Sequence, residues 1–284
     1  MVKKFRKVVI VGTGFMGGCL AKAIKKKKMA QLVWGVVRNK RREKEVKKLN
    51  IFDEVTTNYC QAFKSSDFII LATPVSSILQ CIKILPSYIS KNCVVTDVGS
   101  TKEVILKSAR KYIKENFAGS HPLCGSEKKG AINSVDSLFE NSLCIITPIK
   151  KNKPFKIVKK FWGDLGCKTV ILKEDIHDRI LAYTSGLPHL LSFSLTASLP
   201  PSFSKFIPAS FKELTRISGS PPQVWADIFL TNRFLKKTLN NFLKNLTKLS
   251  ELIEKRDRKK LNSALSKISK KHRKLISASL NNLN

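Results

Sequence analysis

The sequence predicts an α/β chain, in which a doubly wound, mainly parallel sheet is followed by an all-α C-terminal domain. Three observations predict this fold. An apolar run of strand length, residues 8–11 after Lys7, meets a glycine-rich turn and then a helical pattern. Strand and helix patterns alternate from there to residue 172, and only helical patterns follow residue 175. We therefore expect a first domain over residues 1–174 and a helical domain over residues 175–284.

The glycine-rich turn reads Gly12-Thr13-Gly14-Phe15-Met16-Gly17, and the helical pattern of residues 19–28 follows it. In a dinucleotide-binding turn the first glycine permits the bend and the second lets the backbone approach a pyrophosphate. The third lets helix and strand pack closely. Phosphate is favoured by the free N–H groups at the helix start. The pattern predicts a Rossmann-type site, with cofactor contacts from Gly12, Gly14, Phe15, Met16 and Gly17.

A second buried strand, residues 32–37, ends near the position where NAD-binding folds carry a carboxylate for the ribose 2′-hydroxyl. Here the chain reads Arg38-Asn39-Lys40-Arg41-Arg42, with no acidic residue. Cations at this place suit a 2′-phosphate, so the sequence favours NADP over NAD, with Arg38 as the residue that binds the phosphate. The alternative is a solvated run of charge after a strand.

Further strand patterns cover residues 67–74, 93–98, 143–147 and 168–172, with helical patterns between them. Two of these strands end in residues that would face the ligand-binding edge of a parallel sheet. They are Thr73 and Pro74 after the first strand, and Gly99 after the second. We expect these three residues to contact the cofactor.

The C-terminal part reads as a set of helices. Residues 177–199 predict one long helix, kinked near Pro188, and residues 210–217, 223–254 and 258–280 predict three more. Their faces mix apolar and polar residues, which indicates an association surface.

Composition excludes several classes of protein. The net charge of +33 comes from 53 Lys and Arg against 20 Asp and Glu, but the cations are spread along the chain, which predicts only non-specific binding of nucleic acid.

The seven cysteines, none in a C-x-x-C pair, argue against a disulfide framework and a metal site and favour a reducing compartment. We expect Cys19, Cys93, Cys144 and Cys167 to be small buried side chains. The sequence has no apolar run of membrane-spanning length and no cleavable apolar N-terminal segment, so we expect a protein of the cytoplasm or of an organelle stroma.

A second informative stretch is residues 119–130, which we expect to form a glycine-punctuated loop beyond the sheet edge. It contains His121, one of four histidines in the chain. A histidine beside a cofactor can take the proton of a substrate hydroxyl while hydride leaves the same carbon. The alternative is a structural histidine.

The chain resembles the prephenate and arogenate dehydrogenases of tyrosine biosynthesis. The resemblance runs from the N-terminus to about residue 230, and its matching segments are residues 12–18, 97–102, 121–127, 177–178, 185–189 and 211–217. It implies oxidative decarboxylation of prephenate or L-arogenate, giving 4-hydroxyphenylpyruvate or L-tyrosine, with hydride transfer to a nicotinamide cofactor. Prephenate and L-arogenate differ only in a keto or an amino group on the side chain, and the sequence does not decide between them.

The resemblance also implies roles for particular residues. His121 would accept the proton of the ring hydroxyl, and Ser100 would orient it, although Ser100 could instead cap the helix that starts near Lys102. His189 and Arg216 would bind substrate, the guanidinium gripping a carboxylate. Glu127 would gate the pocket. Each of these three residues has an alternative without a function. His189 could be a core histidine, Arg216 a surface cation and Glu127 a solvated glutamate in a loop. The helical half would form a homodimer, as in related enzymes.

The chain departs from the family pattern at three places, Gly186, residues 208–210 and residues 220–222, which bear on the substrate pocket. Two other functions stay open. One is a 3-hydroxyacid or imine oxidoreductase that uses NAD(P), and the other is a cationic nucleic-acid-binding protein on a Rossmann fold.

Overall fold

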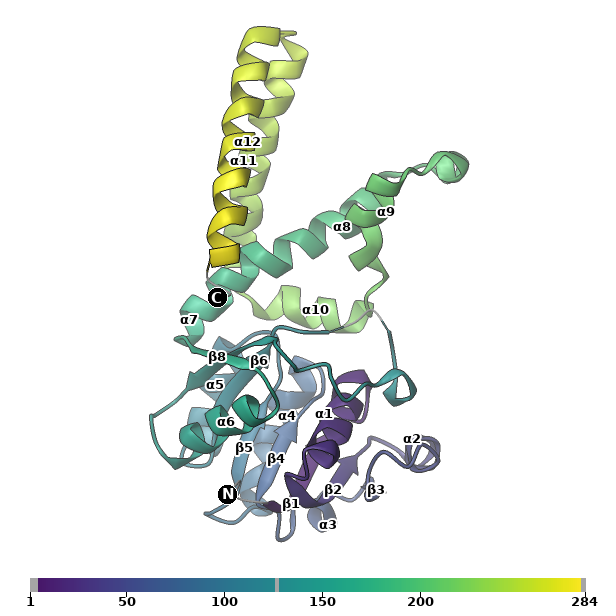
Figure 1. The fold of residues 1–284 in the computed structure, drawn as a ribbon, viewed down its shortest axis with the longest axis vertical. Coiled ribbons are helices and arrows are strands. Elements are labelled where there is room, and N and C mark those ends of the chain that lie inside the picture. Colours follow the sequence, from purple (N-terminus) through teal and green to yellow (C-terminus); the bar gives the residue numbers. More distant parts are fainter. Residues whose placement is uncertain (1–4, 126–127, 282–284) are drawn as a thin grey trace. The chain divides into compact units, whose positions relative to one another are not determined.

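The computed structural model describes residues 5–125 and 128–281 (Figure 1). The chain forms two compact units, and the division falls between Arg233 and Phe234. The change from mixed to purely helical structure falls earlier, because the last strand ends at Ile171. The functional division predicted at residue 174 stays a prediction.

Two sheets make the framework of the first unit. Five strands form a fully parallel sheet in the order β3-β2-β1-β4-β5, and three form a second sheet in the order β6-β7-β8. A parallel bridge from Val95 to Phe117 joins β5 to the residue before β6. The carboxyl ends of β1, β4, β5 and β6 therefore lie at the same edge. The strands are β1 (Phe5–Val11), β2 (Ala30–Val36), β3 (Glu54–Thr56), β4 (Phe68–Leu71), β5 (Val94–Asp97), β6 (Ala118–Pro122), β7 (Leu143–Pro148) and β8 (Lys168–Ile171).

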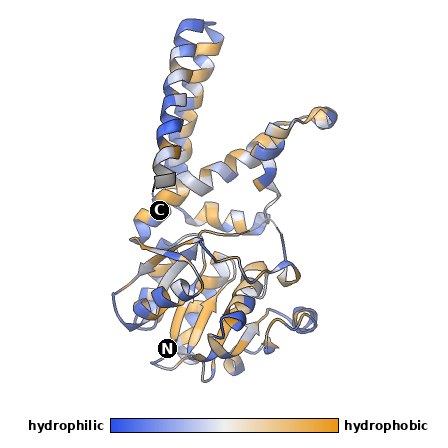
Figure 2. Ribbon diagram, viewed as in Figure 1, coloured by the Kyte–Doolittle hydropathy of each residue, from blue (hydrophilic) through white to orange (hydrophobic). Residues whose placement is uncertain are grey.

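Helices cover both faces of the parallel sheet, as the predicted doubly wound fold requires (Figure 1). Side chains of a strand point alternately to opposite faces. Val8 and Ile10 of β1 accordingly pack in one core with α1 and α6, while Val9 and Val11 pack in the other with α4 and α5. The strands are mostly orange in Figure 2, as strands buried on both faces should be. The helices are α1 (Phe15–Lys26), α2 (Lys40–Lys47), α3 (Tyr59–Phe63), α4 (Val75–Ile84), α5 (Glu103–Tyr112) and α6 (Lys153–Asp164).

The helix predicted over residues 177–199 is continuous but not uniform. It consists of α7 (Glu174–Leu181), a π-helical turn (Ala182–Gly186) and α8 (Leu187–Ser198). The π-helical turn ends two residues before Pro188, which has no N–H to donate to the preceding helical turn. The distortion therefore falls where the kink was predicted. Two more helices complete this unit, α9 (Ala209–Thr215) and α10 (Pro222–Thr231).

The prediction of a single helix over residues 223–254 is wrong, because the helical conformation is interrupted after α10. Asn232 leaves the helical conformation, and its side chain donates a 2.8 Å hydrogen bond to the Asp178 carbonyl. The second unit then contains α11 (Leu235–Glu254) and α12 (Arg258–Asn281), which pack side by side. Arg256 adopts a left-handed conformation with φ of 50° in the turn between them, at the predicted polar break.

All seven cysteines are free thiols, and Cys19, Cys93, Cys144 and Cys167 are buried as predicted. Over the part of the chain that the structure describes, no helix combines the length and apolar character needed to cross a bilayer.

Candidate active site

The glycine turn between β1 and α1 has the geometry that the sequence predicts. Gly12 has a φ of +98°, and a Cβ there would lie 2.5 Å from the Ala72 carbonyl oxygen. A Cβ on Gly17 would lie 1.9 Å from the carbonyl oxygen of Gly12, so helix and strand pack too closely for any side chain. Gly14 differs, because nothing lies within 4 Å of its Cβ position. The backbone at Gly14 thus faces open space at the start of α1, where N–H groups favour an anion.

The other predicted cofactor residues lie around this turn. Phe15 and Met16 begin α1 and are partly buried against the core. Thr73 follows β4, and its methyl group approaches the Cβ position of Gly12. The Thr73 hydroxyl is buried and has no hydrogen-bond partner among the described residues. Pro74 is the exposed N-cap residue of α4. An unpartnered hydroxyl beside an open backbone turn fits a bound dinucleotide.

Gly99 is a buried residue at the end of β5. Its N–H donates to Asp97 Oδ2 at 2.8 Å, and a Cβ would lie 2.5 Å from Ile105. A side chain at this position would have to displace the end of Ile105, so close packing favours a glycine here. The predicted contact of Gly99 with the cofactor stays a prediction.

The basic run after β2 separates into paired and unpaired cations. Lys40, Arg41 and Arg42 belong to α2, where they pair with Glu43 and Glu45. Arg38 is exposed just before that helix and has no ion pair within residues 5–125 and 128–281. The side chain of Arg38 is thus available for a ligand.

His121 lies on strand β6, so the prediction of a loop is wrong. The strand pairs with β7, and a Cβ on Gly119 would lie 2.5 Å from Thr147 Oγ1. The glycine that suggested a loop instead permits two strands to pack closely. His121 and Pro122 lie at the carboxyl end of β6. Because Phe117 bridges β5 in parallel, this end lies at the same edge as the carboxyl end of β5. Ligands bind at this edge in open α/β sheets.

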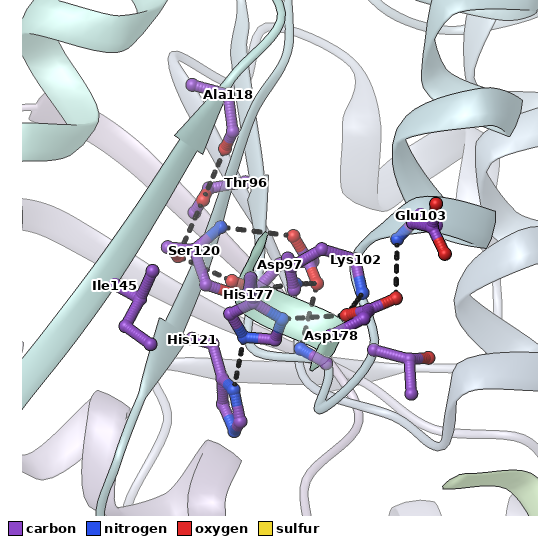
Figure 3. Close-up of polar contacts among 12 residues, drawn as sticks. Thr96, Asp97, Lys102, Glu103, Ala118, Ser120, His121, Ile145, His177 and Asp178 are labelled. Carbon is purple, nitrogen blue, oxygen red and sulfur yellow. Dashed lines mark hydrogen bonds and ion pairs between the residues drawn. The ribbon is translucent and has the colours of Figure 1, made fainter. Parts of the chain in front are cut away.

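A chain of polar contacts lies behind His121 (Figure 3). Its Nδ1 lies 2.9 Å from Nε2 of His177, and Nδ1 of His177 lies 2.7 Å from Oδ1 of Asp178. The Asp178 carboxyl accepts the backbone N–H groups of Lys102 at 2.7 Å and Glu103 at 3.0 Å, which begin α5. His177 and Asp178 are fully buried at the start of α7. The contacts connect β6, α7 and α5 at one point.

A buried ion pair lies beside these contacts. The Lys102 ammonium donates to Asp97 Oδ2 and, at 2.8 Å, to the Ser120 carbonyl oxygen. Both side chains of the pair are fully buried. Burial first, and then the electrostatic influence of His177 and Lys102, hold the pKa of His121 well below its ordinary value of 6.5. Burial and the charge of Lys102 lower the pKa of His177 to about 3. Both rings are therefore neutral at neutral pH.

Ser100 lies between β5 and α5, close in sequence to this cluster. The alternative that it caps α5 is wrong, because the carboxyl of Asp178 accepts the N–H groups at the helix start. In the ranges that the structure covers, the Ser100 side chain makes no hydrogen bond of its own. Its predicted role in orienting His121 and the substrate stays a prediction.

His189 and Arg216 form a second group. The His189 ring stacks on Trp225 of α10, with ring centroids 3.5 Å apart, and its Nδ1 lies 3.0 Å from the Ser185 carbonyl oxygen. Burial lowers the pKa of His189, and the positive charge of Arg216 adds to this effect. The helix α8 packs against the 3₁₀ turn that begins at Arg216. Arg216 is exposed on a short 3₁₀ turn after α9. Glu127, the predicted gate, lies outside the described residues.

Sequence reasoning missed the partners of His121. His177 and Asp178 lie 56 and 57 residues farther along the chain, and only the fold brings them to it. One signal was available, because an adjacent histidine and aspartate begin a helix in a chain with four histidines. Lys102 and Asp97 lie in a matching segment, residues 97–102, but no local pattern indicates that they pair, since lysine is common everywhere in this sequence.

Two family models match the chain. The model described as "Prephenate dehydrogenase, nucleotide-binding domain" matches residues 20–171, and "Prephenate dehydrogenase, dimerization domain" matches residues 173–267.

Individual relatives give the same result over most of the chain. A prephenate dehydrogenase of Bacillus subtilis is 29% identical in an alignment of length 268 that covers 89% of this chain and 72% of the relative. A cyclohexadienyl dehydrogenase of Zymomonas mobilis is 26% identical in an alignment of length 264 that covers 89% of this chain and 90% of the relative. A crystal structure of prephenate dehydrogenase from A. aeolicus, in complex with hydroxyphenyl propionate and NAD+, is 32% identical with a TM-score of 0.85. It covers 95% of this chain and 98% of the relative.

Proposed function

The chain belongs to the prephenate dehydrogenase family and oxidatively decarboxylates prephenate or arogenate, and from this premise we propose which residues carry the reaction and which cofactor they select. A nicotinamide cofactor held at the glycine turn would supply the hydride acceptor for the ring carbon that bears the hydroxyl group. The residues of the protein then have two tasks. They must take the hydroxyl proton, and they must hold the ring while its carboxylate leaves as carbon dioxide.

His121 takes the proton of the ring hydroxyl. The observation that carries this assignment is its position at the carboxyl end of β6, with Nδ1 held by His177 and Nε2 on the opposite side of the ring (Figure 3). A general base must be unprotonated before the reaction. His121 meets this requirement because its pKa lies well below 6.5, so the imidazole is neutral at neutral pH. Ser100, at the end of β5, orients the histidine and the hydroxyl.

The second group binds the substrate away from the reacting carbon. Arg216 offers a planar guanidinium for a carboxylate, and His189 stacks on Trp225 of α10. The helix that carries His189, α8, packs against the 3₁₀ turn that begins at Arg216. A complex with a substrate analogue checks both roles, since the carboxylate should lie within about 3 Å of the guanidinium. A carboxylate bound elsewhere would contradict them.

The cofactor is NADP, held by Arg38. The glycine turn and the Thr73 hydroxyl fit either nicotinamide dinucleotide, so the choice depends on the end of β2. No carboxylate stands there to accept the 2′-hydroxyl of NAD, and Arg38 is the cation of the basic run that α2 leaves unpaired. A guanidinium at this position suits a 2′-phosphate.

Assays of prephenate and L-arogenate, each with NADP and with NAD, test this proposal by the absorbance of the reduced nicotinamide. We expect a higher kcat/KM with NADP. Arg38→Asp should lower the ratio of kcat/KM for NADP to that for NAD by about ten-fold or more, because one charged hydrogen-bonded contact contributes about 1.5–3 kcal/mol. Arg41→Asp is the matched control, since Arg41 already pairs with Glu45, and it should change the ratio little. An unchanged ratio in Arg38→Asp would show that the ribose is recognised elsewhere. Turnover of neither substrate would refute the function.

The helical half mediates a homodimer. The second family model carries the description "dimerization domain", and large apolar side chains are exposed in the single chain, including Leu230 at 87% and Phe206 at 71%. Burying such side chains against a second copy is favourable. Analytical ultracentrifugation should show a dimer at micromolar concentration. A monomer at the concentrations used for assay would contradict this proposal.

A further inference from the structure

The hydrogen bonds behind His121 determine which of its nitrogens carries the proton. Three donors or possible donors converge on the Asp178 carboxyl: the N–H groups of Lys102 and Glu103, and Nδ1 of His177. The two backbone groups can only donate. Burial raises the pKa of Asp178 from 3.8, but these N–H groups and the charges of Lys102 and Arg233 oppose the rise. The start of α5 also favours a negative charge. Together these contacts favour the ionised carboxylate.

An ionised Asp178 carboxylate determines which ring nitrogen carries the proton in His177 and in His121. It can only accept, so Nδ1 of His177 must carry the proton and donate it to Asp178. His177 is neutral, because burial lowers its pKa to about 3, so its Nε2 has a lone pair and no proton. Nε2 of His177 lies 2.9 Å from Nδ1 of His121 and must accept from it. The proton of neutral His121 is then on Nδ1, which leaves its Nε2 unprotonated.

We propose that His177 and Asp178 are positioning residues that hold His121 in the Nδ1–H tautomer, so that Nε2 presents its lone pair to the substrate hydroxyl. This inference rests on the proposed role of His121 as the base. In the opposite tautomer Nε2 carries a proton and cannot accept another. When Nε2 takes the hydroxyl proton, the positive charge of the imidazolium is stabilised through His177 by Asp178. An aspartate that orients a histidine in this way is known to contribute strongly in hydrolases.

The proposal gives the backbone of α5 a part in the site. Because Asp178 also accepts the first N–H groups of that helix, its carboxylate is fixed by the framework and not only by His177. Asn232 adds a hydrogen bond to the Asp178 carbonyl oxygen, which fixes the main chain at the same point. The whole assembly is buried, so solvent does not compete for these hydrogen bonds.

The direct test is ¹⁵N NMR of the ring nitrogens in the full chain with NADP bound. The four histidines make the spectrum simple, and His189→Gln and His272→Gln assign two of them. We expect Nδ1 protonated and Nε2 unprotonated in both His121 and His177. A protonated Nε2 in neutral His121 would overturn the proposal. Because the measurement needs no turnover, this failure is distinct from a failure of the proposed function, which would appear as an active His121→Asn enzyme.

Variants supply a kinetic test. Asp178→Asn removes the negative charge that stabilises the imidazolium of His121, and it should lower kcat about 10- to 100-fold with KM within about two-fold of wild type. The matched control is Asp257→Asn, which makes the same change where a carboxylate accepts the Lys260 N–H at the start of α12, and it should leave kcat unchanged. An Asp178→Asn enzyme with normal kcat would overturn the proposal.

Substitutions of His177 separate positioning from packing. His177→Gln can still accept from Nδ1 of His121 with its amide oxygen, whereas His177→Leu of similar size cannot. We expect the glutamine variant to retain at least about ten-fold more kcat than the leucine variant, which corresponds to about 1.4 kcal/mol. Equal losses in the two variants would show a structural role only.

Discussion

Replacing His121 by asparagine is expected to lower kcat by about 10²- to 10⁴-fold, the usual contribution of a general base. Asparagine fits the space and can still donate to His177 Nε2, but its amide cannot take a proton at the position of the imidazole Nε2. The cofactor residues lie on other elements, the β1–α1 turn and the end of β4. The dissociation constant of NADP should therefore stay within about two-fold of wild type.

Steady-state kinetics and fluorescence titration with NADPH measure the two quantities separately. The control is His272→Asn, the same substitution on an exposed position of α12, and its kcat should equal that of the wild type. A His121→Asn enzyme that keeps more than about a tenth of wild-type kcat would contradict the role of base.

Gly17→Ala should prevent stable folding, with a loss of roughly 3 kcal/mol or more in the free energy of unfolding. The added Cβ would lie 1.9 Å from the Gly12 carbonyl oxygen. This oxygen and the Gly17 Cα that carries the Cβ both belong to backbone that the β1–α1 packing fixes. Neither can move without separating the helix from the sheet. Thermal denaturation followed by circular dichroism measures the effect, and a melting temperature equal to that of the wild type would contradict it.

Gly14→Ala is the matched variant in the same turn. Nothing in the described protein lies within 4 Å of its Cβ position, so the fold should tolerate alanine with a change in stability below about 1 kcal/mol. If the pyrophosphate of the cofactor packs there, the same methyl group should weaken NADP binding about ten-fold or more. Normal affinity in Gly14→Ala would place the cofactor elsewhere.

The sequence predicted the framework well because its strands are buried on both faces. Such strands are continuous apolar runs, as in residues 8–11 and 68–71, and each is followed by a turn signal. The glycine turn was equally readable, since its requirements are local to a few residues. The charged helix α2 was harder to predict from the sequence. It has one buried residue, Val46, and its basic start reads as a charge run.

The site was predicted in part. His121 was identified by motif, but the glycine and proline around it suggested a loop, and only the pairing of β6 with β7 shows that it lies on a strand. The capping of α5 by Asp178 also depends on tertiary structure, because Asp178 lies 75 residues after Glu103 and no local pattern shows that it reaches the start of this helix. The break at Asn232 has the same cause, since its side chain bonds to a residue 54 positions earlier.

The most direct test is a crystal structure of this chain with NADP and 3-(4-hydroxyphenyl)propionate, in which the distance from His121 Nε2 to the phenolic oxygen is measured. We predict a hydrogen bond of about 2.6–3.2 Å, with Nδ1 of His121 still bound to His177. A phenolic oxygen held by other groups, with the His121 ring turned away from it, would contradict the assignment of His121 as the base.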